Sequence, residues 1–134
     1  MKRLYQINQY NIMASDRIPL NRTLKDMRNS LCKAKTYPKS LPKASVIIVF
    51  HNEAWSVLLR TVWSVLNTSP RKILNEIILI DDASEREFLK EPLDDYLAKN
   101  LKDIVKIFHL PKRSVRARPP KSAKRNYYLF SKER

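Results

Sequence analysis

The sequence contains no glycine. A phosphate-binding loop needs backbone that approaches the phosphate without a Cβ in the way, so the Gly-rich dinucleotide fingerprint and the P-loop are both excluded. Cys32 is the only cysteine, which rules out an internal disulfide and a Cys-rich zinc site. No apolar run approaches the ~20 residues of a membrane span, and the first residues show neither a signal peptide nor an anchor.

Acidic residues are scarce at both ends of the chain. Residues 1–50 carry ten Lys/Arg against two Asp/Glu, residues 51–110 eight against ten, and residues 111–134 nine against one. A near-neutral centre therefore lies between two basic arms. A solvated or disordered surface is the simplest interpretation of the arms, and a site for nucleic acid or anionic lipid is the alternative. The lack of a recognisable nucleic-acid module argues against nucleic-acid binding.

The centre of the chain alternates strand and helix patterns, which predicts an α/β fold. Strand, helix, strand, helix, strand with short joints is a right-handed parallel βαβαβ unit, the mononucleotide-binding half of a doubly wound, Rossmann-like sheet. The apolar runs that predict the three strands cover residues 46–50, 76–80 and 105–110.

Local signals place the two helices. Asn52 is the expected N-cap of the first helix, which ends before Pro70 because the residue preceding a proline is pushed away from helical dihedrals. Ser84 with Glu87 matches a capping box that starts a helix or a helical turn, which Pro92 is expected to interrupt before an apolar helical face continues over residues 93–101.

The flanking segments show no sustained periodicity. Residues 1–44 predict an extended N-terminal arm with at most a short helical turn at residues 23–28, either wrapped on the surface or disordered. Residues 111–134 predict a basic, mostly disordered tail without a clear element. The chain is therefore expected to divide into an arm at 1–44, a nucleotide-binding half-domain at 45–110 and a divergent tail at 111–134.

Polar residues follow the first two predicted strands where each strand ends. His51 lies at the first switch from strand to helix, and Asp81 and Asp82 close the second strand. Ligands of open α/β sheets bind at the carboxyl ends of the strands, where a carboxylate accepts hydrogen bonds from ribose hydroxyls or a ring N–H. These residues indicate a nucleotide site. The alternatives are a helix-capping role for one aspartate and an ordinary loop role for the histidine.

Three arginines, Arg113, Arg116 and Arg118, follow the third strand. The planar guanidinium group binds two oxygens of a diphosphate at once, so these residues suit such a ligand. The alternative is that they belong to a solvated basic tail. No carboxylate or histidine cluster with metal-ligand spacing follows Asp103.

Seven short motifs occur together along the chain. They are YNIMASDRI at residues 10–18, DMR at 26–28 followed by Cys32, LP at 41–42, SVIIVFHNEA at 45–54, LLRTV at 58–62, SP at 69–70 and EIILIDDAS at 76–84. Together they resemble the polypeptide N-acetylgalactosaminyltransferases, and the resemblance runs from residue 10 to residue 110. Their joint presence makes the resemblance highly specific.

The resemblance implies a GT-A catalytic domain of a Golgi enzyme. Such enzymes use Mn²⁺ and UDP-GalNAc to place GalNAc on Ser or Thr hydroxyls of mucin-type substrates, with retention of configuration. By position, Val49 and His51 are similar to the family's uridine-contacting pair, and Asp81 or Asp82 is similar to its uracil or ribose partner. Arg116 is similar to the arginine that helps to hold the sugar nucleotide.

The sequence also departs from the family pattern. The family's Gly-Leu-Ile-Arg-x-Arg segment is shortened here to SVRAR at residues 114–118, without the glycine, and no Asp-x-His sequence follows. The resemblance thus implies that the Mn²⁺ ligands and the acceptor site are absent. Cys32 resembles a cysteine whose disulfide partner lies in the missing part, so an orphan thiol is expected.

The leading functional hypothesis is a truncated, inactive polypeptide GalNAc-transferase that binds UDP or UDP-GalNAc weakly at best. The alternative is a non-catalytic module that pairs with an intact transferase or an acidic partner through its basic arms or the unpaired edge of the first strand. Such an edge predicts marginal stability. The family implies the Golgi lumen, whereas a chain without signal or anchor is expected in the cytoplasm.

Overall fold

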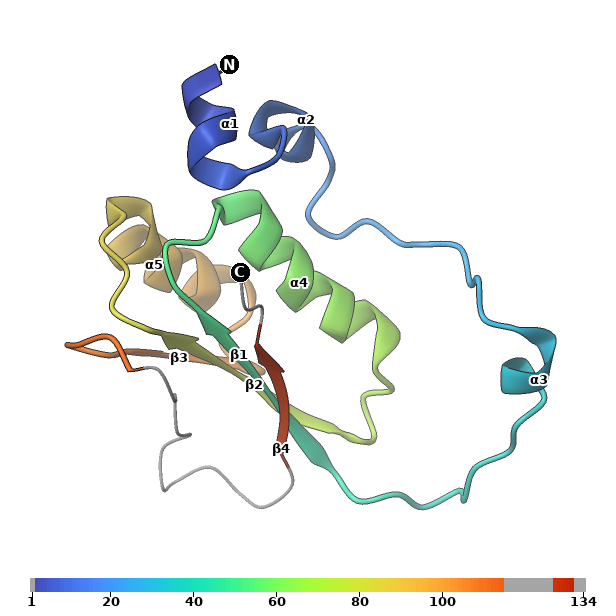
Figure 1. Cartoon of the computed structure of the whole chain (residues 1–134). Helices are drawn as coiled ribbons and strands as arrows, with labels where there is room; N and C mark the ends of the chain where they lie inside the picture. Colours follow the sequence, from blue (N-terminus) through green and yellow to red (C-terminus); the bar gives the residue numbers. More distant parts are fainter. Residues whose placement is uncertain (1, 115–126, 132–134) are drawn as a thin grey trace.

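The computed structural model describes residues 2–114 and 127–131. Its centre is a single four-stranded sheet with the order β3-β2-β1-β4, in which every neighbouring pair is parallel. Figure 1 shows this sheet with the helices beside it. The expected parallel α/β fold is confirmed, and the three predicted strands are present. The strands are β1 (Ala44–Phe50), β2 (Leu74–Asp81), β3 (Val105–His109) and β4 (Tyr127–Ser131).

Two helices cover one face of the sheet. The first, α4 (Trp55–Thr68), presents Leu58, Leu59 and Val62 to the core. The second, α5 (Glu91–Asn100), adds Leu93 and Leu97 to the same cluster. Both crossovers therefore turn the same way, as right-handed βαβ units that progress in one direction along a sheet must do. A smaller cluster of Ile47, Ile78 and Ile80 lies on the opposite face of the sheet.

The helix starts differ from those predicted. Helix α4 begins at Trp55 with Ala54 as a cap that makes no side-chain bond, so the N-cap role expected of Asn52 is wrong. The helical turn expected after Ser84 is present as a short 3₁₀ turn, η1 (Glu87–Leu89), but its N-cap is Arg86, so the capping role expected of Ser84 is wrong. Pro92 does not interrupt a helix but lies in the first turn of α5. Its missing N–H costs nothing there, because the first N–H groups of a helix have no intrahelical partner. The side chains of Asn52 and Ser84 instead join two loops.

The N-terminal arm is partly helical and is attached to α4. It contains α1 (Lys2–Asn8), α2 (Ile12–Asp16) and α3 (Ser30–Lys33), and the helical turn expected at residues 23–28 is wrong. The buried guanidinium of Arg60 donates hydrogen bonds to the backbone oxygens of Ser15 (3.2 Å) and Ile18 (3.0 Å). Leu20 packs against the main core. Residues 23–43 are exposed, and in Figure 1 they swing away from the sheet before β1 begins.

Strand β4 overturns two expectations. The tail was expected to contain no clear element, but Tyr127–Ser131 forms a strand that pairs with β1 from Ser45 opposite Tyr127 to Val49 opposite Ser131. The edge of β1 is therefore paired, and the expected unpaired edge is wrong. A docking role through that edge loses its basis. No helix in the described part of the chain is long and apolar enough to cross a membrane.

Within the described ranges three residues adopt a positive φ, namely Gln9 (61°), Asn52 (48°) and Ala83 (56°). Asparagine tolerates this region because its short polar side chain bonds locally, whereas an alanine Cβ crowds the following carbonyl. A glycine-free chain thus places ordinary side chains where glycine is the default residue.

Ala83→Gly is expected to stabilise the fold. Removing the Cβ relieves about 1–2 kcal/mol, and the greater freedom of glycine in the unfolded chain costs about 0.4–1 kcal/mol, so the free energy of unfolding should rise by up to about 1.6 kcal/mol. Urea denaturation measures it. As the matched control, Ala98→Gly on the exposed side of α5 should lose about 1 kcal/mol. A loss at both positions would contradict the strain at Ala83.

Candidate nucleotide-binding site

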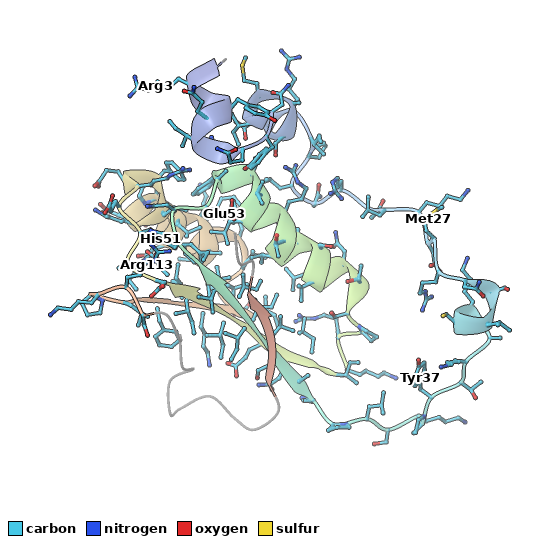
Figure 2. All side chains as sticks on the ribbon, viewed as in Figure 1. Arg3, Met27, Tyr37, His51, Glu53 and Arg113 are labelled. Carbon is cyan, nitrogen blue, oxygen red and sulfur yellow. The ribbon has the colours of Figure 1, made fainter. Side chains whose placement is uncertain are left out.

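The carboxyl ends of β1, β2 and β3 meet at one edge of the sheet. Phe50 lies opposite Asp81, and Asp81 lies opposite His109. The ladder continues one residue further, because Asp82 N–H donates to the Phe50 oxygen (2.8 Å) and Leu110 N–H to the Asp81 oxygen (2.9 Å). The three loops that follow the strands therefore start side by side, as parallel strands require. Figure 2 shows His51, Glu53 and Arg113 gathered at this end, far from Met27 and Tyr37 on the arm.

The two neighbouring aspartates have different surroundings. Asp81, 2% exposed, accepts hydrogen bonds from Ser84 N–H through Oδ1 and contacts His109 Nδ1 through Oδ2, both at 2.8 Å. Asp82, 7% exposed, accepts a hydrogen bond from Ser114 N–H through Oδ1 (2.6 Å). Arg113 Nε lies 4.0 Å from Asp82 Oδ2, beyond hydrogen-bond range, so this oxygen keeps acceptor capacity for a ligand.

Strand alternation explains the difference between the aspartates. Side chains of successive strand residues point to opposite faces, so Asp81 shares the helix-covered face with Ile77 and Leu79. Its partner His109 in turn contacts Asp94 of α5. By the same alternation, Val49 shares the opposite face with Ile47, and it packs against the small cluster there. The prediction from sequence did not distinguish Asp81 from Asp82, although the alternation of side chains along a strand places them on opposite faces of the sheet.

His109 belongs to the framework behind the site edge, and the sequence did not indicate it. Its Nδ1 lies 2.8 Å from Asp81 Oδ2 and its Nε2 lies 3.1 Å from Asp94 Oδ1, so both ring nitrogens face carboxylate acceptors. Only the imidazolium form can donate both bonds. Burial lowers the pKa of His109, but the hydrogen bonds and charges of the two carboxylates outweigh it and hold the pKa above its ordinary value. The ring therefore ties β3 and β2 to α5.

Stability should depend on pH through His109. Since the folded pKa lies above the unfolded value, the contribution is complete below the unfolded pKa and is lost as the pH rises through the folded pKa. The stability advantage of the wild type over His109→Gln should be larger at about pH 5.5 than at about pH 8.5. The side chain is 35% exposed, so screening limits the effect to about 0.5–1 kcal/mol. Urea denaturation at both pH values tests this, and an advantage that grows with pH would contradict it.

His51 lies where the sequence placed it, at the end of β1 and beside Asp82. Its Nδ1 lies 2.8 Å from the backbone oxygen of Asp82, and its Nε2 lies 3.2 Å from Asn52 Nδ2. The structure thus brings together Val49, His51 and Asp82 at adjacent strand ends and assigns Asp81 to the framework behind them. Arg116 and Arg118 lie outside the described residues. Asn52 and Ser84 were identified in the sequence only as helix caps, and their bonds between loops had no sequence signal.

A hollow of about 290 Å³ lies beside this edge. It opens between the loop after β2, the start of α5 and the end of β3. Of the predicted site residues that the structure describes, only Asp81 lines it, and the ring nitrogens of His109 contact the carboxylates of Asp81 and Asp94. The hollow is therefore a feature of the helix-covered side and not of the edge formed by His51 and Asp82. No group of three or more His, Cys, Asp or Glu residues within the described ranges could hold a metal ion.

The sequence matches the family model of glycosyl transferase family 2 over residues 45–118, and the chain belongs to this family. Two relatives narrow the assignment within this family. Polypeptide N-acetylgalactosaminyltransferase 13 of Homo sapiens is 60% identical over 120 residues, which cover 88% of this chain and 21% of that protein. Polypeptide N-acetylgalactosaminyltransferase 3 of Drosophila melanogaster is 59% identical over 114 residues, which cover 85% of this chain and 17% of that protein.

A solved structure gives the same assignment. The crystal structure of GalNAc-T7 with UDP, GalNAc and Mn²⁺ superposes with a TM-score of 0.79 at 46% identity, and the match covers 84% of this chain and 21% of that chain. Within family 2, the chain belongs with the polypeptide N-acetylgalactosaminyltransferases. It spans about a fifth of the length of these relatives.

Proposed function

We propose that this chain supplies the uridine-binding part of a polypeptide GalNAc-transferase. The observation that carries the proposal is the contact of His51 Nδ1 with the Asp82 backbone oxygen, which joins two predicted ligand residues across neighbouring strand ends. Asp82 Oδ2 would accept a hydrogen bond from a ring N–H or a ribose hydroxyl, and Val49 would give an apolar wall beside it. The GalNAc-T7 structure, which contains UDP, supports the ligand class.

Cations beside the same edge suit the diphosphate of such a ligand. Arg113, 70% exposed at its side chain, follows β3 and lies near Asp82. We assign it to the phosphate side of the site, and we assign Arg116 to the same role on its similarity to the family. With two such cations and no glycine loop, phosphate binding would rest on side-chain charge alone.

The chain alone is proposed not to transfer GalNAc. The resemblance implies Mn²⁺, but the described residues do not fit it, since they offer no group of three ligands, and the sequence contains no Asp-x-His. Stabilisation of the negative charge on the leaving diphosphate by a cation is a large part of such catalysis. Without Mn²⁺ to supply this stabilisation, the 134-residue chain should bind the nucleotide without turnover. A Golgi location and a chain that pairs with an intact transferase stay predictions.

Thermal unfolding at rising UDP concentration tests the proposed function. A ligand that binds only the folded chain stabilises it by RT ln(1 + [L]/Kd), or about 1.4 kcal/mol when UDP is at about ten times Kd. CDP at the same concentrations is the control for the base, and pyrophosphate is the control for charge. An equal shift with pyrophosphate would replace the uridine site by a simple anion site. Release of UDP from UDP-GalNAc in the presence of a Ser/Thr peptide and Mn²⁺ would contradict the predicted lack of transfer.

A further inference from the structure

Asn52 connects the first two loops of the site edge through both its backbone and its side chain. Asn52 N–H donates to Ser84 Oγ (2.8 Å), and Glu85 N–H donates to Asn52 Oδ1 (2.8 Å). Two bonds of normal length thus link the loop after β1 to the loop after β2. Asn52 makes these bonds with a positive φ of 48°, a conformation that asparagine accepts better than most residues.

The same bonds fix which way the Asn52 amide points. Glu85 N–H is a donor, so the atom that receives it must be the amide oxygen, which leaves the amino group on the other side. That amino group lies 3.2 Å from His51 Nε2. Because an amino group only donates, Nε2 must be the acceptor of this bond and carries no proton.

The other ring nitrogen of His51 has the opposite requirement. His51 Nδ1 lies 2.8 Å from the backbone oxygen of Asp82, and a carbonyl oxygen only accepts. Nδ1 must therefore carry the proton. The two neighbours together select the neutral Nδ1–H tautomer, and a proton on Nε2 would bring two donors face to face. Glu85 N–H thus fixes the orientation of the Asn52 amide, and the amide in turn fixes the protonation of the His51 ring.

We propose that Asn52 is a positioning residue that holds His51 as a neutral Nδ1–H ring and fixes the ring against Asp82. The inference rests on the proposed function, because it concerns how His51 meets the uridine ligand. With both nitrogens engaged inside the protein, His51 contributes the face and carbon edge of a fixed, uncharged ring. It does not donate from Nε2 and brings no positive charge, so recognition of the diphosphate falls to other residues such as Arg113.

The tautomer can be read without any nucleotide. Long-range ¹H–¹⁵N correlation spectra of the full chain should show a protonated Nδ1 and an unprotonated Nε2 for His51. Asn52→Gly keeps a residue that accepts positive φ but removes the amide, so the Asp82 carbonyl alone holds the proton on Nδ1 and the share of the Nδ1–H tautomer should fall. Asn52→Asp replaces the amino group that faces Nε2 by an oxygen, so Nε2 should gain a proton. A wild-type ring protonated at Nε2 would overturn the inference, and so would an Asn52→Gly spectrum identical to that of the wild type.

UDP titration of the same variants separates this inference from the proposed function. Asn52→Gly is expected to weaken UDP binding by about three- to tenfold, the effect of losing one hydrogen bond behind a contacting ring. Binding by the wild type with unchanged affinity in Asn52→Gly would overturn the positioning role and leave the uridine site intact. If the wild type binds no UDP, the proposed function fails, and the role of Asn52 in fixing the ring is decided by the spectra alone.

Discussion

Asp81→Ala is expected to lower the free energy of unfolding by about 2–4 kcal/mol, a large share of the 5–15 kcal/mol typical of a domain. The carboxylate is 2% exposed and bonds to Ser84 N–H and to His109. Truncation leaves a buried N–H without this acceptor and removes one of the two charges that hold the His109 ring. Breaking a buried charged contact from one side is costly, because the other partner stays in place.

Urea denaturation measures this loss, and two further variants sharpen it. Asp81→Asn keeps an oxygen for Ser84 N–H but places an amino group where Oδ2 faces His109 Nδ1, so the charge and the acceptor toward the ring are lost and the free energy of unfolding should fall by about 1–2 kcal/mol. Asp95→Ala removes an exposed carboxylate from α5 and should stay within about 0.5 kcal/mol of the wild type. A loss in Asp81→Ala no greater than that in Asp95→Ala would contradict a framework role for Asp81.

Asp82→Ala is expected to weaken UDP binding by about tenfold or more. The proposed ligand bond runs to a carboxylate, and hydrogen bonds to charged groups contribute about 1.5–3 kcal/mol. Asp82 also accepts a bond from Ser114 N–H, so part of the effect would come through the loop that carries Arg113. Titration calorimetry with UDP measures the change, and a melting curve shows that the variant is folded.

The matched control for Asp82 is Asp103→Ala. Asp103 is an exposed aspartate just before β3 begins, at the opposite end of the sheet, and its removal changes the net charge equally. It should leave the affinity for UDP within about a factor of two. Asp82→Asn, which retains an acceptor oxygen for Ser114, should fall between the wild type and Asp82→Ala. Equal losses in Asp82→Ala and Asp103→Ala would show that UDP responds to overall charge and not to the proposed site.

The sheet could be predicted from the sequence because its signals are local. The apolar runs gave the three strands within two residues of their observed ends, since a buried strand needs continuous apolar sequence. The place of His51 and Asp82 followed from the same strands, because parallel strands bring their carboxyl ends together. Alternation along β2 would also have assigned Asp81 to the helix-covered face.

The remaining features depend on contacts between distant residues. Asn52 and Ser84 carry cap-like side chains, and only tertiary structure decides that they bond to each other's loops and not to a helix start. The contact of Arg60 with Ser15 and Ile18 spans more than forty residues, so no periodicity predicts that the N-terminal arm binds α4. Strand β4 was missed because Tyr127–Ser131 is short and stands alone in a basic segment.

The most direct test of the central claim is isothermal titration of the 134-residue chain with UDP. If the edge formed by Val49, His51 and Asp82 is a uridine site, UDP should bind at one site per chain with a Kd of about 0.1–1 mM. The Asp82→Ala variant should then require about tenfold more ligand. A wild-type chain that is folded and gives no binding heat at UDP concentrations up to about ten times that Kd would contradict the account.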